Sequence, residues 1–334
     1  LGVLALFVLM AYGQEKKFAL YSVAFYNMEN LFDTIHDEGK NDYEYLPNGT
    51  NQWNTMKYKA KLKNMSEILS MLSTDKLPMG PAIIGVSEIE NYRVLEDILK
   101  QPALADRGYR YVHYEGEDQR GVDCAFFYNP KLFELTNSKL VPYVYINDTV
   151  HKTRGFLIAS GNIAGEKMHF IVNHWPSRAA ASPARERAGE QVRAIKDSLL
   201  REDSAAKIVI MGDMNDDPMD KSMAVALGAK RKPADVGPTD LYNPWWDTLK
   251  KGYGTLMYKG KWNLFDQIVF TGNLLGTDRS TLKFYKHEIF RRDFMFQKEG
   301  KYKGYPKRTQ AGGVWLNGYS DHLPTIIYLI KEVK

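Results

Sequence analysis

The amino-acid sequence predicts a mixed α/β fold in which two β-sheets pack face to face and helices cover their outer surfaces. Short apolar runs typical of strands alternate along the chain with amphipathic stretches at helical spacing. Several predicted strands are rich in aromatic residues, as in residues 124–128, which favours a core between packed sheets. Polar residues recur where the predicted strands end, and this recurrence indicates one shared site.

The first half of the chain alternates short strands with two helices. A helix is predicted over residues 55–73, where Leu62, Met65 and Leu69 recur at helical spacing, and residues 94–99 form the apolar stripe of another. Apolar or alternating runs bounded by polar turns predict strands over 18–25, 82–86, 110–113 and 123–128.

The second half repeats this alternation around two irregular segments. A helix is predicted over residues 183–200, with Val192 and Ile195 facing inward. Residues 228–260 are rich in Pro, Gly, Trp and Tyr and predict a long surface excursion, and residues 285–307 form a basic, aromatic insertion. Strands are predicted over 155–163, 168–172, 207–211, 264–270 and 325–330.

One domain is predicted over residues 18–332 of the 334, because large two-sheet domains can use roughly 250 residues or more. Residues 1–13 are apolar, and a run of that length is too short for a membrane helix, which needs roughly 20 residues. We expect a signal peptide without its Met and basic leader, and therefore an exported, periplasmic or extracellular protein with no stable membrane insertion after cleavage. A buried strand or an uncleaved anchor is the alternative.

The net charge and the cysteine content discriminate less between possible functions. The net charge of +5 suits an anionic partner, although Lys and Arg are scattered along the chain, as on any solvated basic surface. Cys124 is the single cysteine, so no intrachain disulfide is possible, and its apolar surroundings predict a buried thiol. The sequence is silent on oligomeric state, and a monomer is the working expectation.

Two junctions between strands and turns carry acids, amides and imidazoles. The apolar run 208–211 leads into Asp213 and Asn215, and Asp321 and His322 precede the last predicted strand. A phosphate ester resists hydroxide because its own charge repels the nucleophile, so hydrolysis needs a divalent cation, a base and a proton donor. Oxygen ligands favour Mg²⁺, with Mn²⁺ or Ca²⁺ as substitutes. These junctions predict metal-assisted hydrolysis of phosphate esters.

Individual roles follow from side-chain chemistry. Glu88 and Asp321 are carboxylates suited to Mg²⁺, and Asn27 and Asn215 can offer amide groups to a metal or a phosphate without adding charge. Asp213 is the candidate base for water.

Histidine is the natural proton carrier near neutral pH, and both His174 and His322 follow polar strand ends. Asp266, at the head of a predicted strand, is the candidate partner of His322, and Asp123 is considered as a partner of His174. Any one of these residues alone could simply cap a turn or lie on the surface.

As an ordered set, these residues resemble the endonuclease/exonuclease/phosphatase superfamily, which has the deoxyribonuclease I-like fold. The resemblance covers nearly all of the mature chain and implies a four-layer α/β/β/α sandwich with the site at one end of the two sheets. Its motifs are Asn27 with Glu29, Ser87-Glu88, Asn173-His174, Gly212-Asp213-Met214-Asn215, Asp266-Gln267-Ile268 and Ser320-Asp321-His322.

The resemblance also implies roles. Glu88 would be the principal Mg²⁺ ligand, with Asn27 and Asp321 completing or neighbouring the metal site. Asp213 and Asn215 would position the attacking water. His322, paired with Asp266, would contact the scissile phosphate, and His174 would lie near the leaving group. The remaining members are Arg154 and Asn173, expected with Asn27 to bind phosphate, and Glu29, which stands where many nucleases have Asp and is the candidate ligand of a second metal.

The sequence therefore predicts an exported, Mg²⁺-dependent phosphodiesterase, with nucleic acid, DNA or RNA, as the favoured substrate. Trp245, Trp246 and the basic stretch 291–307 could stack bases and hold phosphates, or could pack a long loop onto the sheet edge. One alternative is a phosphomonoesterase or a phospholipid phosphoesterase of the sphingomyelinase or inositol-phosphate kind, although residues 285–307 are too polar for a membrane-contacting hairpin. A second alternative is a non-catalytic anion-binding protein.

Overall fold

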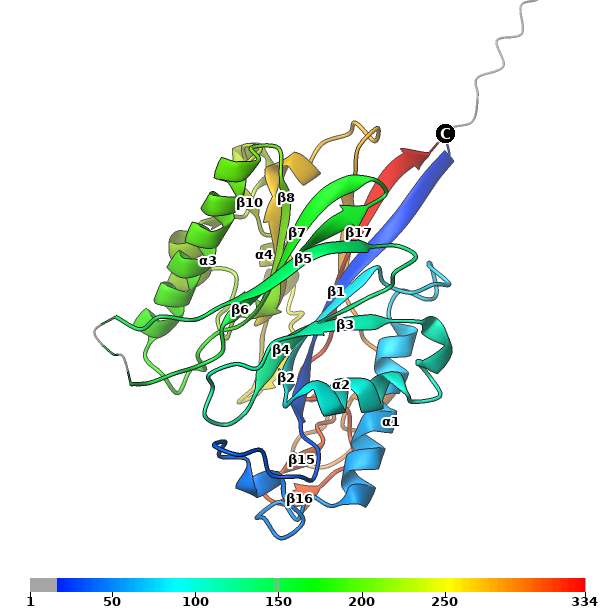
Figure 1. Cartoon of the computed structure of the whole chain (residues 1–334), viewed down its shortest axis with the longest axis vertical. Helices are drawn as coiled ribbons and strands as arrows, with labels where there is room; N and C mark the ends of the chain where they lie inside the picture. Colours follow the sequence, from blue (N-terminus) through cyan, green and yellow to red (C-terminus); the bar gives the residue numbers. More distant parts are fainter. Residues whose placement is uncertain (1–16, 147, 149, 334) are drawn as a thin grey trace, which may run out of the picture.

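Two large β-sheets form the centre of the molecule in a computed structural model that describes residues 17–146, 148 and 150–333 (Figure 1). The predicted signal peptide, residues 1–13, lies outside the described residues. Within the described part, no helix combines the length and the apolar character that crossing a membrane requires.

The first sheet has six strands and joins the two ends of the described chain. β1 pairs antiparallel with β17 and parallel with β2. Its strand order is β14 (Lys283–Ile289), β17 (Thr325–Val333), β1 (Lys17–Leu31), β2 (Ile83–Ile89), β4 (Asp123–Tyr128) and β3 (Arg110–His113).

The second sheet has seven strands. Its central pair, β7 and β8, is parallel, and β8 pairs antiparallel with β13. Its order is β5 (Glu134–Val141), β6 (Phe156–Ile163), β7 (Glu166–His174), β8 (Lys207–Asp213), β13 (Asp266–Thr271), β10 (Leu241–Tyr242) and β9 (Ala229–Lys230). Two small hairpins, β11 (Leu256–Tyr258) with β12 (Lys261–Asn263) and β15 (Gln310–Ala311) with β16 (Val314–Trp315), complete the strands.

Three hydrophobic cores separate four layers, which confirms the predicted α/β/β/α sandwich. Successive residues of a strand point to opposite faces of a sheet, so Ala24 of β1 packs under the helices whereas Phe25 packs between the sheets. Val209 and Ile210 of β8 divide in the same way between the inter-sheet core and the outer core. The α-helices of the described residues are α1 (Thr55–Met71) and α2 (Tyr92–Leu99) on the first sheet, α3 (Ser182–Glu202) on the second, and the short α4 (Trp246–Lys250) (Figure 1).

The structure differs from the sequence prediction most clearly at two strands of the large sheets and at one loop. β5 and β14 were not predicted, because both are partly exposed and carry charged residues that hide the alternation of an amphipathic strand. The segment 228–260 is less irregular than expected, since it contains short strands and α4. Trp245 within it is fully buried, and its indole N–H donates to the carbonyl of Ile268, so this side chain belongs to the core.

Backbone irregularities lie where β1 and β2 run side by side. Glu29 and Asn30 have φ angles of 45° and 52°, and Glu88 in β2 has a φ of 58°, although side chains other than glycine rarely adopt positive φ. The register of the β1–β2 pair shifts at the same place, between Asn27 and Leu31. Such a bulge re-aims the side chains it carries, and here it directs Glu88 toward the end of the second sheet.

Candidate active site

A polar pocket of about 360 Å³ lies at the end of the sandwich where several strands finish. β1 and β2 are parallel, as are β7 and β8, so the carboxyl ends of each pair deliver side chains to the same end of the molecule. The pocket, called the catalytic pocket below, is lined by Glu88, Arg120, Arg154, His174, Ser177, Asp213, Asn215 and His322. Five of the predicted catalytic and metal-binding residues are therefore brought together.

Asn27 joins the two acids of the pocket. Its amide nitrogen Nδ2 donates to Oε1 of Glu88 and to Oδ2 of Asp213, both at 3.0 Å, and its oxygen accepts the backbone N–H of Glu29 at 2.8 Å. That backbone donor fixes which end of the amide is which. The carboxamide oxygen thus faces away from the acids, and the predicted role of Asn27 as a metal ligand is not supported by its orientation; its N–H groups are at the site.

The predicted pair of His322 and Asp266 is present. Nδ1 of His322 lies 2.7 Å from Oδ2 of Asp266, which is fully buried at the start of β13. Burial by itself would lower the pKa of His322, but the carboxylates of Asp266 and Asp213 outweigh it and raise that pKa well above the ordinary value. His322 is therefore an imidazolium at neutral pH, and its Nε2 lies 3.8 Å from Asp213 and 4.0 Å from Asp321.

Asp213 has the properties of a base that works near neutral pH. Burial raises its pKa to about 7; His322 opposes this shift, and Asp266 and Glu88 reinforce it. Its Oδ1 accepts the backbone N–H of Asn215 at 2.9 Å, which holds the carboxylate in place. Asn215 itself has a φ of 51°, so the turn after β8 is shaped to present this N–H.

His174 ends β7 and faces both acids. Its Nε2 lies 3.7 Å from Oε1 of Glu88 and 3.7 Å from Oδ2 of Asp213, and its Nδ1 is buried without a hydrogen-bond partner. Burial, with smaller effects of Arg154 and Arg120, lowers the pKa of His174 well below its ordinary value, so the imidazole is neutral. The predicted partner Asp123 is wrong, because that carboxylate lies 3.1 Å from Nε2 of His113.

Glu88, His174 and Asp213 can hold a divalent cation. Each offers a ligand atom, and these atoms lie within 4.8 Å of one another. Both oxygens of Glu88 accept one N–H each, from Asn27 and from the backbone of Asn30, which orients the carboxylate and leaves lone pairs free. The carboxylates suit Mg²⁺ and Mn²⁺.

The other predicted metal ligands, Glu29 and Asp321, are already neutralised by side chains. Nε of Arg308 donates to Glu29 at 2.8 Å, and its Nη2 lies 3.0 Å from Asp321. The backbone N–H of Thr309 donates to the second oxygen of Glu29 at 2.7 Å, and the buried ammonium of Lys61 lies 3.9 Å away. A guanidinium thus occupies the space between these carboxylates, so as placed they do not fit a second cation.

Of the two remaining phosphate-binding candidates, Arg154 faces the catalytic pocket and Asn173 does not. Arg154 lines the catalytic pocket, with one nitrogen donating to Asp118 at 3.0 Å and another to the carbonyl of Trp175 at 2.9 Å. Asn173 is fully buried, and its amide donates to the carbonyls of Ile171 and Met211. Asn173 therefore clamps β7 to β8 and does not face the pocket, which corrects its predicted role.

Sequence reasoning missed Arg120, Ser177 and Arg308. Arg120 and Ser177 lie in loops beside the catalytic pocket. A single charged or hydroxyl residue in a loop carries no pattern that distinguishes it from a solvated surface residue. Ser177 lies three residues after His174, just beyond the end of β7, and this closeness to a candidate residue was the one available signal.

Comparisons with known proteins agree with this architecture. A Bacteroides thetaiotaomicron protein of the endonuclease/exonuclease/phosphatase family has a similar structure, with a TM-score of 0.59, 15% identity, and coverage of 96% of this chain and 98% of that one. A mannosyl-6-phosphatase from the same organism gives 0.57 and 14%, covering 92% and 99%. D. rerio TDP2 in complex with a single-stranded DNA product gives 0.53 and 14%, covering 93% and 99%. No curated protein matches the sequence.

At these identities the structural similarities establish the fold alone. The family comes from the sequence itself, because residues 22–331 match the endonuclease/exonuclease/phosphatase family, and this range includes the bulged end of β1, both histidines and every acid of the catalytic pocket. The chain therefore belongs to the endonuclease/exonuclease/phosphatase family of metal-dependent phosphoester hydrolases.

Proposed function

We propose that the protein is an exported, Mg²⁺-dependent hydrolase whose substrate is the phosphate ester of a small alcohol. The observation that carries the phosphate-ester chemistry is the amide of Asn27, which holds Glu88 and Asp213 together beside the ion pair of His322 and Asp266. A cation ligand, a base and a fixed positive charge are the three elements that such hydrolysis requires.

The residues divide the reaction between them. Water attacks phosphorus in line with the bond to the alcohol, and Asp213 accepts a proton from that water while the N–H of Asn215 holds its carboxylate. The imidazolium of His322, oriented by Asp266, donates to a non-bridging oxygen of the phosphate as charge develops there. A bound Mg²⁺, held by Glu88, supplies Lewis-acid polarisation of the phosphate. The P–O bond breaks, and the leaving alkoxide takes its proton from solvent.

His174 receives a different role from the one the family resemblance implied. Its Nε2 is equidistant from Glu88 and Asp213, so it lies beside the cation and the attacking side, whereas in-line attack places the leaving alcohol opposite Asp213. We therefore assign His174 to cation or phosphate binding. The guanidinium of Arg154, on the same wall, supports the phosphate's negative charge.

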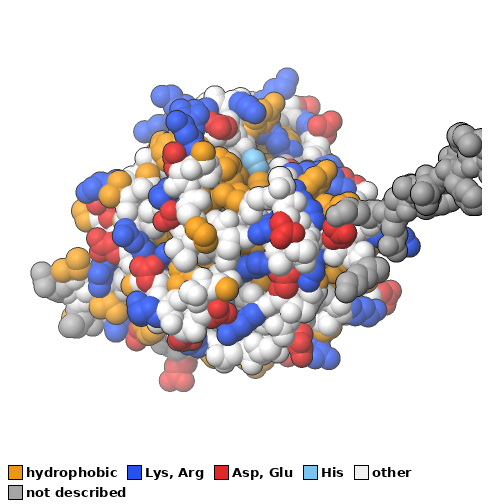
Figure 2. All heavy atoms as spheres, turned by 90° about the horizontal axis from the view of Figure 1, so that it is seen from above, with side chains coloured by type: hydrophobic (Ala, Val, Ile, Leu, Met, Phe, Trp, Pro, Cys, Tyr) orange, Lys and Arg blue, Asp and Glu red, His pale blue; other side chains and the backbone are white. Residues whose placement is uncertain are grey.

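A nuclease is the second candidate, since the sequence favours nucleic acid. Arg120 and Arg154 line the catalytic pocket, and Arg178 lies beside it, which suits a polyanion. One observation weighs against it. Arg291 packs on the rings of Trp262 and Phe296, so this cation of the basic insertion is used in packing. Figure 2 shows the opposite end of the molecule, where β1 begins and β17 ends, and there Lys and Arg are interspersed with acidic side chains.

A substrate panel tests the proposal. Purified protein is assayed with 4-nitrophenyl phosphate, bis(4-nitrophenyl) phosphate, hexose phosphates, inositol phosphates, sphingomyelin, plasmid DNA and RNA, each with Mg²⁺ and with EDTA. We expect EDTA-sensitive release of phosphate from the small monoesters. Activity that survives EDTA would contradict a cation-dependent reaction, and preferred cleavage of DNA or RNA would establish the second candidate.

Export and a monomeric state are further parts of this proposal. The apolar character of residues 1–13 supports export. Fractionation of expressing cells, with sequencing of the mature N-terminus, checks cleavage near Gly13, and gel filtration with light scattering checks the mass. Retention of the uncleaved segment in the cytoplasm would contradict export.

A further inference from the structure

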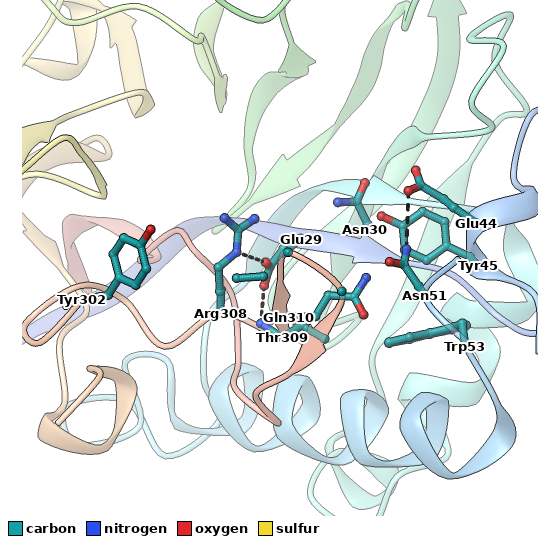
Figure 3. A pocket seen from close by; sticks show the side chains of 13 residues that line it. Glu29, Asn30, Glu44, Tyr45, Asn51, Trp53, Tyr302, Arg308, Thr309 and Gln310 are labelled. Atoms are coloured by element: carbon teal, nitrogen blue, oxygen red, sulfur yellow. Dashed lines mark hydrogen bonds and ion pairs between the residues drawn. The ribbon is translucent and has the colours of Figure 1, made fainter. Parts of the chain in front are cut away.

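A second polar cavity of about 380 Å³ opens beside the catalytic pocket, and it is called the amide pocket below. Its wall begins at Asn30, whose backbone N–H donates to Oε2 of Glu88 at 3.0 Å. Arg308 lies on the same wall and reaches Asp321, the neighbour of His322 in the chain. The two cavities therefore share a boundary made of Glu88, Arg308 and Asp321. Figure 3 shows Arg308 beside Glu29 in the amide pocket.

The amide pocket is lined by polar side chains that make few hydrogen bonds within the protein and can therefore bind a ligand. Among the described residues, no hydrogen bond involves the side-chain amide of Asn30 or of Gln310, and the side-chain amide of Asn51 makes one long contact, a donation to Glu44 at 3.4 Å. Figure 3 shows Asn30, Glu44, Asn51 and Gln310 arranged around a common hollow, with Tyr302 apart from them on the far side of Arg308. Side-chain amides each donate and accept, and so can serve a partner that does both.

The aromatic rings of the amide pocket are poorly placed to stack a nucleobase. Tyr45 is stacked on Phe32 with ring centroids 4.1 Å apart, and Trp53 meets Tyr45 edge-on at 85°. Trp53 is 1% exposed, and its N–H donates to the carbonyl of Phe32. These rings form a floor that is already packed, not an open slot between parallel faces.

The charges of the amide pocket disfavour a second anionic group. Glu44 has no cation within salt-bridge distance among the described residues and adds a negative charge to the rim. Arg308, the cation that lines the pocket, is already shared by Glu29 and Asp321. A further phosphate, as in a nucleic-acid strand, would meet Glu44 without a free positive partner.

We propose that the amide pocket binds the alcohol part of the substrate and that this alcohol is rich in hydroxyl groups, as in a hexose. A hydroxyl donates and accepts at once, which matches the three amides, and Glu44 accepts from hydroxyls while it repels anions. The position also fits, because Asn27 joins Oε1 of Glu88 to Asp213, whereas Asn30 on the wall of the amide pocket binds Oε2 of Glu88. In-line attack by the water at Asp213 leaves the departing alcohol on the far side of the phosphate. This inference rests on the proposed phosphoester hydrolysis and names its substrate class.

The experiment compares hydroxyl-rich and hydroxyl-free monoesters in three proteins. The substrates are mannose 6-phosphate, glucose 6-phosphate and myo-inositol 1-phosphate, against phenyl phosphate and 4-nitrophenyl phosphate. The proteins are the wild type, the double variant Asn51→Ala/Gln310→Ala, and the control Asn137→Ala, which removes an exposed amide from β5 in the other sheet. Neither Asn51 nor Gln310 touches the catalytic residues in the structure.

We expect the double variant to raise KM for at least one sugar or inositol phosphate by about tenfold, the effect of losing one or two neutral hydrogen bonds, with kcat nearly unchanged. The hydroxyl-free esters and the control variant should keep wild-type values. Equal loss on both substrate classes, no change on either, or wild-type preference for the hydroxyl-free esters would overturn the proposal.

A binding measurement separates this inference from the proposed function. Mannose 6-phosphate and glucose 6-phosphate are titrated calorimetrically, with Mg²⁺ present, into Asp213→Asn and into Asp213→Asn carrying the two amide substitutions. Hydrolysis of 4-nitrophenyl phosphate without a preference for sugar phosphates would overturn the amide-pocket proposal alone. If no ester is hydrolysed, the proposed function fails, and the calorimetry still decides the pocket: weaker binding in the amide variant supports it, and equal or absent binding overturns it.

Discussion

Two carboxylate clusters at the same end of the sandwich differ in what neutralises them. Glu88 and Asp213 are joined by the neutral amide of Asn27, with the neutral imidazole of His174 and the imidazolium of His322 nearby. Glu29 and Asp321 are instead bridged by the permanent charge of Arg308, with Lys61 beneath. The first cluster keeps lone pairs for an exchangeable cation, whereas the second has a cation built in, so similar acids close together do not by themselves predict two metals.

The largest effect is expected from loss of the base in the first cluster. Asp213→Asn should lower kcat by about 10³-fold, because proton transfer by a positioned side chain contributes roughly 10²–10⁴-fold. Steady-state kinetics on the best substrate of the panel measure this, with circular dichroism to check folding. Asp197→Asn, which changes a half-exposed acid on α3, is the control and should leave kcat unchanged. A folded Asp213→Asn enzyme with wild-type turnover would remove Asp213 from the reaction.

The Mn²⁺ affinity of two matched variants, one in each cluster, tests whether only the first cluster binds a metal. Glu88→Gln should weaken Mn²⁺ binding by roughly 100-fold, while Glu29→Gln should leave it nearly unchanged. Glu29→Gln should instead lower the free energy of unfolding by about 3 kcal/mol, since it leaves the buried ammonium of Lys61 without its carboxylate. Electron paramagnetic resonance titration of Mn²⁺ and urea unfolding measure the two quantities. If Glu29→Gln strongly weakened Mn²⁺ binding, Glu29 would belong to the same metal site as Glu88, and the distinction between the two clusters would be wrong.

The pH profile tests the charge balance of the first cluster. Asp213 acts as a base only when deprotonated, and its pKa is about 7, so kcat/KM should rise with pH through about 7; a bound cation moves this limb to lower pH. His322 lowers the pKa of Asp213, so His322→Gln should move the limb to higher pH as well as reduce the rate. The raised pKa of His322 places the falling limb on the alkaline side. An acid limb that moves to lower pH in His322→Gln would contradict this coupling.

The smallest expected effect is on metal stoichiometry. Wild-type protein should bind one Mn²⁺ per chain at high affinity, and Arg308→Met should admit a second, weaker Mn²⁺ between Glu29 and Asp321, because removal of the guanidinium frees both carboxylates. Equilibrium dialysis counts the bound ions. Arg292→Met, which removes a cation lying over Phe290, serves as the matched control. If the wild-type protein bound two Mn²⁺ ions with high affinity, Glu29 and Asp321 would already be able to hold a metal in the presence of Arg308.

Much of the fold and most of the site could be predicted from the sequence. The buried strand β4 was predicted at its observed bounds because an apolar run between polar turns is a local signal, and the short, partly exposed β3 was also predicted at its bounds. The pairing of His322 with Asp266 was predictable because an imidazole on a phosphate needs an acid to orient it. The edge strand β14 was not, since its charged residues make it resemble a loop.

The misassigned roles depended on contacts between distant parts of the chain. Glu29 was assigned to a metal, and its actual partner, Arg308, lies 279 residues further on, directly after the segment 285–307 that was taken for an insertion. Asn27 and Asn173 were identified as site residues by type, but which end of an amide faces the site is decided by backbone groups of neighbouring strands. Residue type and order predict which side chains meet; orientation and charge balance require the assembled structure.

The positive φ of Glu88 has a consequence for how this chain responds to selection. Glycine or asparagine would adopt that backbone conformation with less strain, so a screen for thermal tolerance alone should enrich Glu88→Gly or Glu88→Asn. Those chains would melt later and lose their best cation ligand. Thermal stability and catalytic activity therefore favour different residues at position 88. A thermostable variant of this protein is best selected with Glu88 kept unchanged.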